Sequence, residues 1–434
     1  MKTVTTLNTL ISKAKTNFSL TEPADQESLY ALTSALCELD NLTTDTLLKA
    51  AGKVDTPLEF KLAAKLMDSR RYALNVKDKL NIGVVYAMWG EQNRLLPKSK
   101  NNPNGEDSLR TKITQMNWVT ADTPIDWTLY AVDDGCPYNS GRIAQEMADS
   151  HLHGGKVSVL FLNEAVPTDK GPLRELKSAD DSRKAGAIIL GCMQAISDGK
   201  DVVVYTDADN SVHLGQIGLL LRPFLDDNYR AVLGNRKDPD AVLVKEEGRW
   251  GIGIKLLRHM QRMVGQAIFS RNILDTQAAF KLYERNLLQQ IIDTPTVFDF
   301  SFDSDWLLAT IRMGESFAKV PFAFIDSFAE SASITQGPMT TWEVLLMGLV
   351  KAVRRHGVFH NEEMARVLDE EIKSSADLEV LIHHLPPELE NADAALLGDP
   401  AVMSPVAVQE WIKQRKAAAL TTQKFGNQGL LSEP

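Results

Sequence analysis

Two pairs of aspartates in this chain each follow a run of apolar residues. Asp133 and Asp134 come directly after LYAV, and Asp207 and Asp209 come after VVVYT. Carboxylates that converge repel one another unless cations or hydrogen-bond donors balance them. Oxygen-rich clusters of this kind suit Mg²⁺ or Mn²⁺, which commonly bind through one or two carboxylates together with phosphate oxygens. The two pairs therefore predict a site for a divalent cation and a nucleotide diphosphate, provided that the fold brings them together.

The Asp-x-Asp motif of the second pair does not indicate a functional site without its position in the fold. The chain repeats Asp-x-Asp at Asp238 and Asp240 and again at Asp303 and Asp305, and acidic residues in turns are usually solvated. What favours a functional interpretation is that Asp207 follows a predicted buried strand. Ligands of parallel α/β sheets bind at the carboxyl ends of the strands.

The elements that would position these aspartates alternate along residues 79–330. LNIGVVYAM, DWTLYAV, KVSVLFL and DVVVYT are typical of buried strands, and GEDSLRTKITQMNWV, GRIAQEMADSHL and DSRKAGAIILGCMQAISDG are typical of helices. Such alternation predicts right-handed crossovers and a mostly parallel sheet covered by helices on both faces. Both acidic pairs would then project from the same edge of the sheet.

Helical sequence flanks this region on both sides. We predict a helical N-terminal domain over 1–78, an α/β domain over 79–337 and a helical C-terminal extension over 338–434. Leu29, Leu32, Leu36 and Leu39 recur at helical spacing, which favours packing or oligomerisation over chemistry. A homo-oligomer formed through the helical extensions is therefore an expectation.

The composition narrows the class of protein. The formal net charge of the 434 residues is −10, which disfavours a general nucleic-acid partner. Cys37, Cys136 and Cys192 lie far apart without metal-ligand spacing, as expected in a reducing compartment. No run approaches the roughly 20 apolar residues that span a bilayer, and the N-terminus lacks the apolar stretch of a signal peptide. We expect a cytoplasmic protein without an integral membrane segment.

The ordered set VDDG, RKAGAIILG and TDADNS resembles the nucleotide-binding half of family 2 glycosyltransferases, which have the GT-A fold with a mostly parallel Rossmann-like sheet. ILDTQAAFKLYERNLL, FDFSFDSDWLLATIRMG and FAKVPFAF are similar to the dolichyl-phosphate glucosyl- and mannosyltransferase branch. The resemblance covers residues 79–330 and neither flank. The chain departs from the family pattern at Cys136, which replaces a Ser, at Ala278 and Ala279, and at Asp305, which replaces a Glu. We expect no membrane anchor of the kind that is typical of that branch.

The resemblance implies roles on the donor side. Asp133 or Asp134 would contact the nucleotide base, uracil by this resemblance, and Asp207 and Asp209 would hold the divalent cation, Mg²⁺ or Mn²⁺, against the diphosphate. The basic positions that would lie near the donor are Arg183, Lys184 and Arg236. Ser211 is a candidate for an additional polar ligand.

The resemblance also implies roles on the sugar and acceptor side. Asp275, Gln277 and Lys281 would line the sugar and acceptor, and Asp303 and Asp305 match the acidic pair, with Asp305 at the position of the catalytic carboxylate. Structural alternatives stay open for Asp275, Lys281, Asp303 and Asp305. Asp275 would be the N-cap of a helix AAFKLYERNLLQQI, Lys281 would lie on a solvated face of it, and the two later aspartates would occupy a first helical turn. The basic run from Lys351 to His356 would be a solvated helix end.

These observations predict a metal-dependent enzyme, a hexosyltransferase. It would move a hexose from a UDP- or GDP-linked donor to a soluble or phosphate-bearing acceptor whose identity the sequence does not reveal. Two alternatives are a sugar-phosphate nucleotidyltransferase and a non-catalytic scaffold that resembles a transferase. The first would show a Gly-rich Arg-Lys signature after the first strand, which MWGEQNRLLPKSKNNPNG matches weakly.

Overall fold

The computed structural model describes residues 2–39, 41–245, 251–326 and 337–429. The chain divides into two compact units. The first comprises Met1–Glu246, Leu274–Thr294 and Glu315–Glu330, and the second comprises Glu247–Ile273, Pro295–Gly314 and Ser331–Pro434. The sheet and the helical residues that precede it therefore belong to one unit.

A seven-stranded sheet in the order β3-β2-β1-β4-β7-β5-β8 forms the centre of the first unit. Its pairings are parallel except those of β7, which is antiparallel to both β4 and β5. A second sheet pairs β6 with β9 in parallel. The strands are β1 (Leu80–Met88), β2 (Ile125–Asp133), β3 (Val157–Phe161), β4 (Val202–Thr206), β5 (Ala231–Asn235), β6 (Val242–Val244), β7 (Phe280–Glu284), β8 (Phe317–Pro321) and β9 (Ala323–Ile325). The predicted mostly parallel sheet is confirmed.

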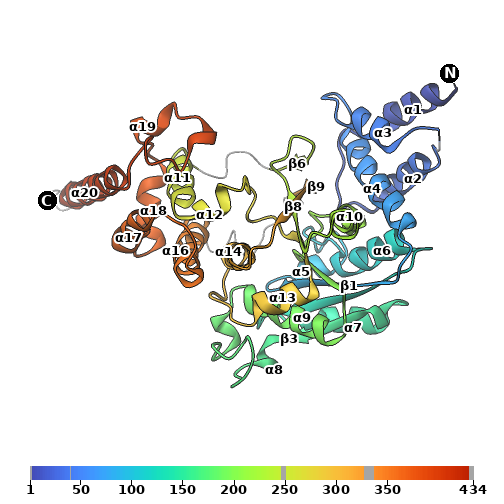
Figure 1. The fold of residues 1–434 in the computed structure, drawn as a ribbon, viewed down its shortest axis with the longest axis horizontal. Helices are drawn as coiled ribbons and strands as arrows, with labels where there is room; N and C mark the ends of the chain where they lie inside the picture. The colour runs from blue at the N-terminus through green and yellow to red at the C-terminus, as the bar shows by residue number, and fades with distance from the viewer. Residues whose placement is uncertain (1, 40, 246–250, 327–336, 430–434) are drawn as a thin grey trace. The chain divides into compact units, whose positions relative to one another are not determined.

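Helices cover both faces of this sheet, with α6 and α10 on one side and α9 and α13 on the other (Figure 1). The α-helices of the first unit are α1 (Lys2–Lys13), α2 (Pro23–Cys37), α3 (Thr44–Ala51), α4 (Leu58–Asn75), α5 (Gln92–Leu95), α6 (Ser108–Thr120), α7 (Ser140–Ser150), α8 (Leu162–Ala165), α9 (Ala185–Ser197), α10 (Ile217–Asp227) and α13 (Arg285–Ile292). Each predicted strand and helix of residues 80–206 is present.

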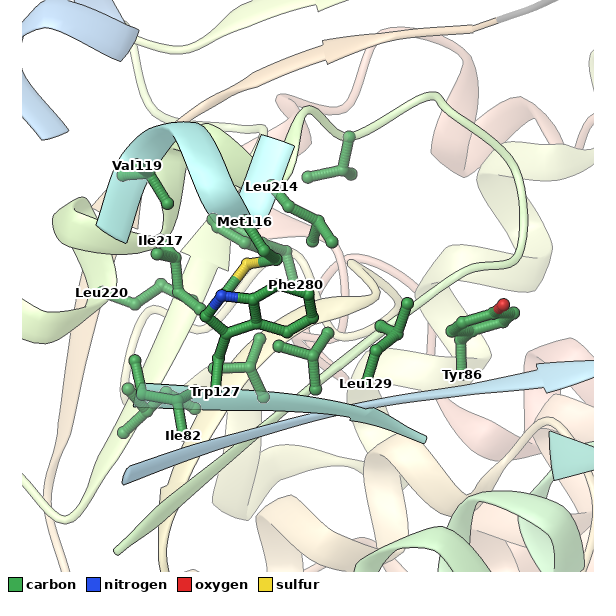
Figure 2. Packing of buried hydrophobic residues seen from close by; sticks show 14 of the residues in the cluster. Ile82, Tyr86, Met116, Val119, Trp127, Leu129, Leu214, Ile217, Leu220 and Phe280 are labelled. Carbon is green, nitrogen blue, oxygen red and sulfur yellow. The ribbon is translucent and has the colours of Figure 1, made fainter. Parts of the chain in front are cut away.

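One face of the sheet packs its alternate residues against α6 and α10. Side chains alternate between the two faces of a strand, so Ile82 of β1 and Trp127 of β2 point to the same side. Trp127 packs in the same cluster as Met116 of α6 and Leu220 of α10 (Figure 2). All of these side chains are buried, and they form the main apolar core of the unit.

The opposite face of the sheet allows α9 to approach closely. A Cβ atom on Gly191 of α9 would lie 2.4 Å from Val85 Cγ1 and 2.9 Å from Val132 Cγ2. A Cβ on Gly83 of β1 would lie 3.0 Å from the Cβ of Ala195. Because glycine leaves these spaces open, α9 runs along the sheet, and its first turn reaches the carboxyl ends of β2 and β4, where the acidic pairs lie.

The leucine stripe of α2 is buried inside the first unit. Leu29, Leu32 and Leu36 belong to a second apolar cluster that also contains Ala323 and Ile325 of β9. The stripe therefore packs within the chain, and its burial needs no second copy.

The segment AAFKLYERNLLQQI differs from its prediction. Its first half forms β7 between β4 and β5, and the helix begins only at Arg285. The cap of that helix is Glu284, whose carboxylate accepts hydrogen bonds from the backbone N–H groups of Asn286 and Leu287, both at 2.9 Å. The interpretations of Asp275 as a helix N-cap and of Lys281 on a solvated helix face are therefore wrong. Phe280 and Leu282 also fit a two-residue period, and only the neighbouring strands decide between the two periods.

The second unit is helical. Its α-helices are α11 (Ile254–Val264), α12 (Gln266–Phe269), α14 (Phe302–Arg312), α16 (Pro338–His356), α17 (Glu362–Glu371), α18 (Ser375–Ile382), α19 (Pro387–Glu390) and α20 (Pro405–Gly429). Helix α14 packs against α16 and α12. Among the residues that the structure describes, no helix has the length and hydropathy required to cross a bilayer.

Candidate active site

Charged side chains gather at the carboxyl edge of the large sheet. The parallel strands β1, β2, β4 and β5 end there, and the antiparallel β7 begins there. This edge carries both acidic pairs, together with Arg236 after β5 and Asp275 before β7. The fold thus brings together residues that are more than 140 positions apart in the sequence, such as Asp133 and Asp275.

The pair at the end of β2 is fully engaged by its own chain. Asp133 accepts hydrogen bonds from the backbone N–H of Cys136 at 2.8 Å and of Gly141 at 2.7 Å. Asp134 accepts from Ser182 Oγ at 2.6 Å and from the backbone N–H of Lys184 at 2.7 Å. Each of the four carboxylate oxygens therefore has a donor. Burial raises the pKa of Asp134 to about 6, although these hydrogen bonds oppose the shift.

Asp134 in turn fixes the first turn of α9. Lys184 precedes that helix with a φ of 83°, a conformation that is strained for a residue with a side chain. Its ammonium forms an ion pair with Asp207. Burial raises the pKa of Asp207. Lys184, followed by Arg236 and Lys112, lowers it by a larger amount, so the net shift is downward. Asp207 is therefore held ionised. Arg183 lies beside this turn with an exposed side chain.

Asp209 is held through its backbone and has one carboxylate oxygen to spare. The ammonium of Lys112 donates to the main-chain oxygen of Asp209, and Asp209 Oδ1 accepts from the backbone N–H of Ser211 at 3.0 Å. Oδ2 accepts no hydrogen bond from the described residues. Ser211 Oγ is buried and likewise has no hydrogen-bond partner within the described ranges.

The residues around Asp209 fit a divalent cation. Burial, followed by the charge of Asp207, raises the pKa of the Asp209 carboxyl, because two carboxylates compete for neutralisation there. A divalent cation would relieve that repulsion. Among the described residues, no three His, Cys, Asp or Glu side chains converge to hold a metal. The protein would thus supply one or two carboxylates, as Mg²⁺ sites completed by substrate phosphates do.

A buried network behind Asp209 was not singled out by sequence reasoning. Arg94 lies 3.2 Å from Glu91 through Nη1 and 3.2 Å from Glu106 through Nε. Burial raises the pKa of Glu91 to about 7, and Arg94 opposes that shift. The only signal in the sequence was an accumulation of charges in EQNRLLPKSKNNPNGED, which is equally typical of a solvated loop.

Arg236 and Asp275 bind each other. Arg236 donates to Asp275 through its backbone N–H at 2.7 Å, through Nε at 2.9 Å and through Nη2 at 2.7 Å. Burial raises the pKa of Asp275, but the hydrogen bonds and charge of Arg236 lower it by a larger amount, so this carboxyl stays ionised. The guanidinium also lies 5.0 Å from the ring centroid of Phe324. The pair ties the end of β5 to the segment that enters β7.

Lys281 and Gln277 follow Asp275 and have different environments. The Lys281 side chain is fully buried, and its ammonium donates to the main-chain oxygens of Thr276 at 3.0 Å and Ala278 at 2.6 Å. It also lies 5.3 Å from the ring centroid of Tyr205. Gln277 is half-buried. Lys281 therefore shapes the DTQAA turn from inside the sheet.

Two exposed aromatic side chains at the same edge were also missed. Trp89 follows β1 and Tyr138 follows the Asp133–Asp134 pair; their ring centroids lie 6.0 Å apart with an interplanar angle of 79°. The side chains are 37% and 53% exposed, which is high for aromatic residues. Cys136 connects their two loops, because its sulfur accepts from the backbone N–H of Gly90 at 3.2 Å. A thiol is thus accommodated where the family commonly has a serine.

Asp303 and Asp305 belong to the second unit, in the first turn of α14, and both are buried. Asp305 Oδ2 accepts from the backbone N–H of Thr296 at 3.0 Å, and Oδ1 lies 2.7 Å from Nε2 of His356. The His356 side chain is 9% exposed. The expectation of a solvated helix end is therefore wrong for this histidine, because Asp305 receives it inside the unit.

Comparison with known proteins identifies the α/β region. Residues 104–292 match the family model of glycosyl transferase family 2. This part of the chain is therefore similar to family 2 glycosyltransferases. The predicted glycosyltransferase is confirmed by this match, and the predicted fold class is confirmed by the mostly parallel sheet.

The similar proteins include one curated enzyme and two solved structures. Undecaprenyl-phosphate mannosyltransferase of Micrococcus luteus is 23% identical over 205 residues, 44% of this chain and 79% of that protein. Glucosyl-3-phosphoglycerate synthase of Mycobacterium tuberculosis is 14% identical and covers 68% of this chain and 84% of its own, with a TM-score of 0.41. Mannosyl-3-phosphoglycerate synthase of Rubrobacter xylanophilus is 16% identical and covers 66% and 76%, with a TM-score of 0.42.

Proposed function

We propose that this family 2 glycosyltransferase transfers a hexose from a nucleotide-sugar, UDP- or GDP-linked, with the help of Mg²⁺ or Mn²⁺. The observation that carries the proposal is the Asp209 carboxylate. It has a spare oxygen at the carboxyl edge of the sheet, beside an ionised Asp207 and next to cationic side chains. Such a combination suits a cation and the phosphates that the cation would accompany.

The chain's own residues would act mainly on the donor. A divalent cation bound by Asp207 and Asp209 would supply Lewis-acid stabilisation of the leaving diphosphate. Lys184 and Arg183 would add positive charge near the same phosphates, and Asp134 would hold Lys184 in place through its backbone N–H. Arg236 would be orientated by Asp275, on the side of the donor where β5 ends.

The exposed pair Trp89 and Tyr138 supports a nucleotide donor. Aromatic rings that lie beside a phosphate-binding edge offer an apolar surface on which a base can stack. Asp133 and Asp134 lie between Trp89 and Tyr138 in the sequence, at the end of β2. We therefore propose that this end of the edge takes the base.

The acceptor is proposed to be a soluble or phosphate-bearing molecule. The name of the Micrococcus luteus relative indicates a phosphate-bearing acceptor for that enzyme. In the transfer step, the bond between the anomeric carbon and the diphosphate oxygen breaks, and a bond to an acceptor oxygen forms. A hydroxyl acceptor loses its proton to a base, whereas a phosphate acceptor is already anionic and needs none.

Asp305 is proposed as that base, together with Asp303 in the same helical turn. Its carboxylate contacts His356, so a proton received there would be shared by the pair. Asp305→Asn should lower kcat for a hydroxyl acceptor by about a hundredfold or more while leaving the Kd of the donor unchanged. An unchanged kcat would remove Asp305 from the catalytic group and leave it as a partner that orientates His356.

The function is tested by a screen of nucleotide-sugars against the purified chain. Thermal unfolding would be followed with UDP- and GDP-sugars, each with Mn²⁺, with Mg²⁺ and with EDTA. Slow donor hydrolysis would be measured for any sugar that raises the melting temperature, in the wild type and in Asp209→Ala. We expect one nucleotide class to stabilise the protein only with a divalent ion, and hydrolysis to be lost in the variant. Failure of every nucleotide-sugar to bind with any divalent ion would overturn the proposal.

A further inference from the structure

The segment between β1 and α6, together with α6 itself, places charged side chains in the interior behind the loop that carries Asp209. Glu91, Arg94, Glu106 and Lys112 are each no more than 9% exposed, although charged residues are rarely buried in proteins. None of the four has a role in the function proposed above. Their contacts lead, one by one, to Asp209.

Glu106 holds the residue next to Asp209 at two points. Its carboxylate Oε2 accepts from the backbone N–H of Asn210 at 2.9 Å, and its own main-chain oxygen accepts from Asn210 Nδ2 at 2.9 Å. Asn210 is buried. Two bonds that act on the backbone and the side chain of one residue restrict both its position and its rotation. The direction of the Asp209 side chain is restricted with it, because the two residues share a peptide plane.

Arg94 contacts Glu106 at two points, through one hydrogen bond and one ion pair. The main-chain oxygen of Arg94 accepts from the Glu106 N–H at 3.1 Å, and Arg94 Nε lies 3.2 Å from Glu106 Oε1. The guanidinium also reaches Glu91 through Nη1. A planar guanidinium can serve two carboxylates in fixed directions, which a lysine ammonium cannot do.

Lys112 completes the arrangement from α6. Its buried ammonium donates to the main-chain oxygen of Asp209. Burial lowers the pKa of Lys112, whereas the charges of Asp209 and Glu106 raise it. The backbone on both sides of the Asp209 side chain is thus anchored, by Lys112 at the carbonyl of Asp209 and by Glu106 at Asn210.

Stability by itself explains this network poorly. Buried ion pairs lose much of their attraction to the cost of removing charges from water, and apolar replacements of similar volume are often as stable or more stable. An arrangement that fixes the direction of one carboxylate has a different benefit. Residues that hold metal ligands in place typically change metal affinity 10–100-fold when they are mutated, as known for ligand-orientating partners in general.

We propose that Glu106 and Arg94 are positioning residues, which fix the Asp209 carboxylate in the direction that a divalent cation requires. The proposal rests on the proposed function, because it assumes that Asp209 binds a cation. It assigns a purpose to the charged segment between β1 and α6 and predicts a defect in cation affinity rather than in donor chemistry.

The experiment compares two changes in the network with one matched change outside it. Glu106→Gln keeps an acceptor for Asn210 but loses the charge that faces Arg94, and Arg94→Lys keeps the positive charge but loses the two-carboxylate geometry. Glu146→Gln on the exposed face of α7 is the control. Binding of Mn²⁺ alone would be measured by the electron paramagnetic resonance signal of the free ion, and thermal unfolding would be recorded for every variant.

We expect both network variants to bind Mn²⁺ at least tenfold more weakly and the control to match the wild type. At saturating Mn²⁺, the KM for the donor should stay within about threefold of the wild type. If both variants are folded and bind Mn²⁺ like the wild type, the positioning role is refuted while the proposed function stands. If one network variant fails to fold, the Mn²⁺ affinity of the other variant still tests the positioning role. If the wild type binds no Mn²⁺ either alone or with the donor, the proposed function itself fails and this proposal fails with it.

Discussion

The ends of β2 and β4 carry the same kind of acidic pair and hold it in different ways. At β2, Asp133 and Asp134 accept four hydrogen bonds, three from backbone N–H groups and one from a serine hydroxyl. At β4, Asp207 pairs with the ammonium of Lys184, and Asp209 keeps an oxygen without a hydrogen bond from the described residues. The β2 pair stabilises the conformation of the neighbouring loops, and the β4 pair leaves negative charge available to a ligand.

This difference separates two uses of a carboxylate that are identical in the sequence. A carboxylate whose oxygens are all occupied by backbone donors stabilises a local conformation and has little capacity left for a ligand. A carboxylate that is oriented through its neighbours and has an oxygen to spare can still bind a cation. Substitutions at the two pairs should therefore have different effects on activity and on stability.

Asp209→Asn should reduce donor turnover with Mn²⁺ about a thousandfold or more, with little change in the free energy of unfolding. The amide keeps the acceptor for the Ser211 N–H but lacks the charge that a cation needs. The measurement is kcat/KM for the donor, with urea denaturation as the parallel test of stability. Retention of more than a tenth of the activity would place the cation elsewhere.

Asp133→Ala should have the opposite profile. Loss of the carboxylate leaves the backbone N–H groups of Cys136 and Gly141 without their acceptor, which should lower the free energy of unfolding by about 4 kcal/mol. Urea denaturation checks this, with exposed Asp180→Ala as the control. A stable but inactive Asp133→Ala protein would contradict the comparison and make this carboxylate a ligand of the donor.

Asp134 should make stability depend on pH in a defined window. Its folded-state pKa of about 6 lies above the ordinary value of 3.8, so between these values the folded protein binds more protons than the unfolded chain. Stability linked to this group is therefore present below about pH 4 and is lost as the pH rises to about 6. Because Asn does not titrate, Asp134→Asn should gain on the order of 3 kcal/mol relative to the wild type between pH 4 and pH 7.

Urea denaturation of the two proteins at several pH values gives this difference directly. A difference in the free energy of unfolding that stays constant across the window would show that Asp134 is already ionised when folded. The β2 pair would then resemble the β4 pair more closely than its hydrogen bonds suggest.

Trp89→Ala and Tyr138→Ala should have the smallest effects. Each should raise the KM for the nucleotide-sugar about tenfold with kcat nearly unchanged, because stacking on a base contributes about 1–3 kcal/mol. Steady-state kinetics test this, with Phe359→Ala as the control for loss of an exposed aromatic residue. An unchanged KM in both variants would show that the nucleotide base does not bind against the loops around the β2 pair.

Much of the first unit could be predicted because its local patterns agree with one another. Apolar runs such as LNIGVVYAM and VVVYT became buried strands, and the acidic pairs that follow them lie at one edge, as the rule for parallel sheets requires. The family resemblance of VDDG and TDADNS was specific enough to identify the glycosyltransferase. The DTQAAFKLYE segment failed because its apolar residues fit the periods of both a helix and a strand, and pairing with β4 and β5 decided for the strand.

The sequence by itself determined the fold class, the resemblance to family 2 glycosyltransferases and the presence of carboxylates at strand ends, because these depend on residue order and local periodicity. Only the tertiary structure decided which carboxylates are occupied and which are available. Hydrogen-bond partners such as Ser182 for Asp134, Glu106 for Asn210 and His356 for Asp305 lie 48, 104 and 51 positions away. No local pattern reports such distant contacts, since they arise when separate elements meet at a sheet edge or between packed helices.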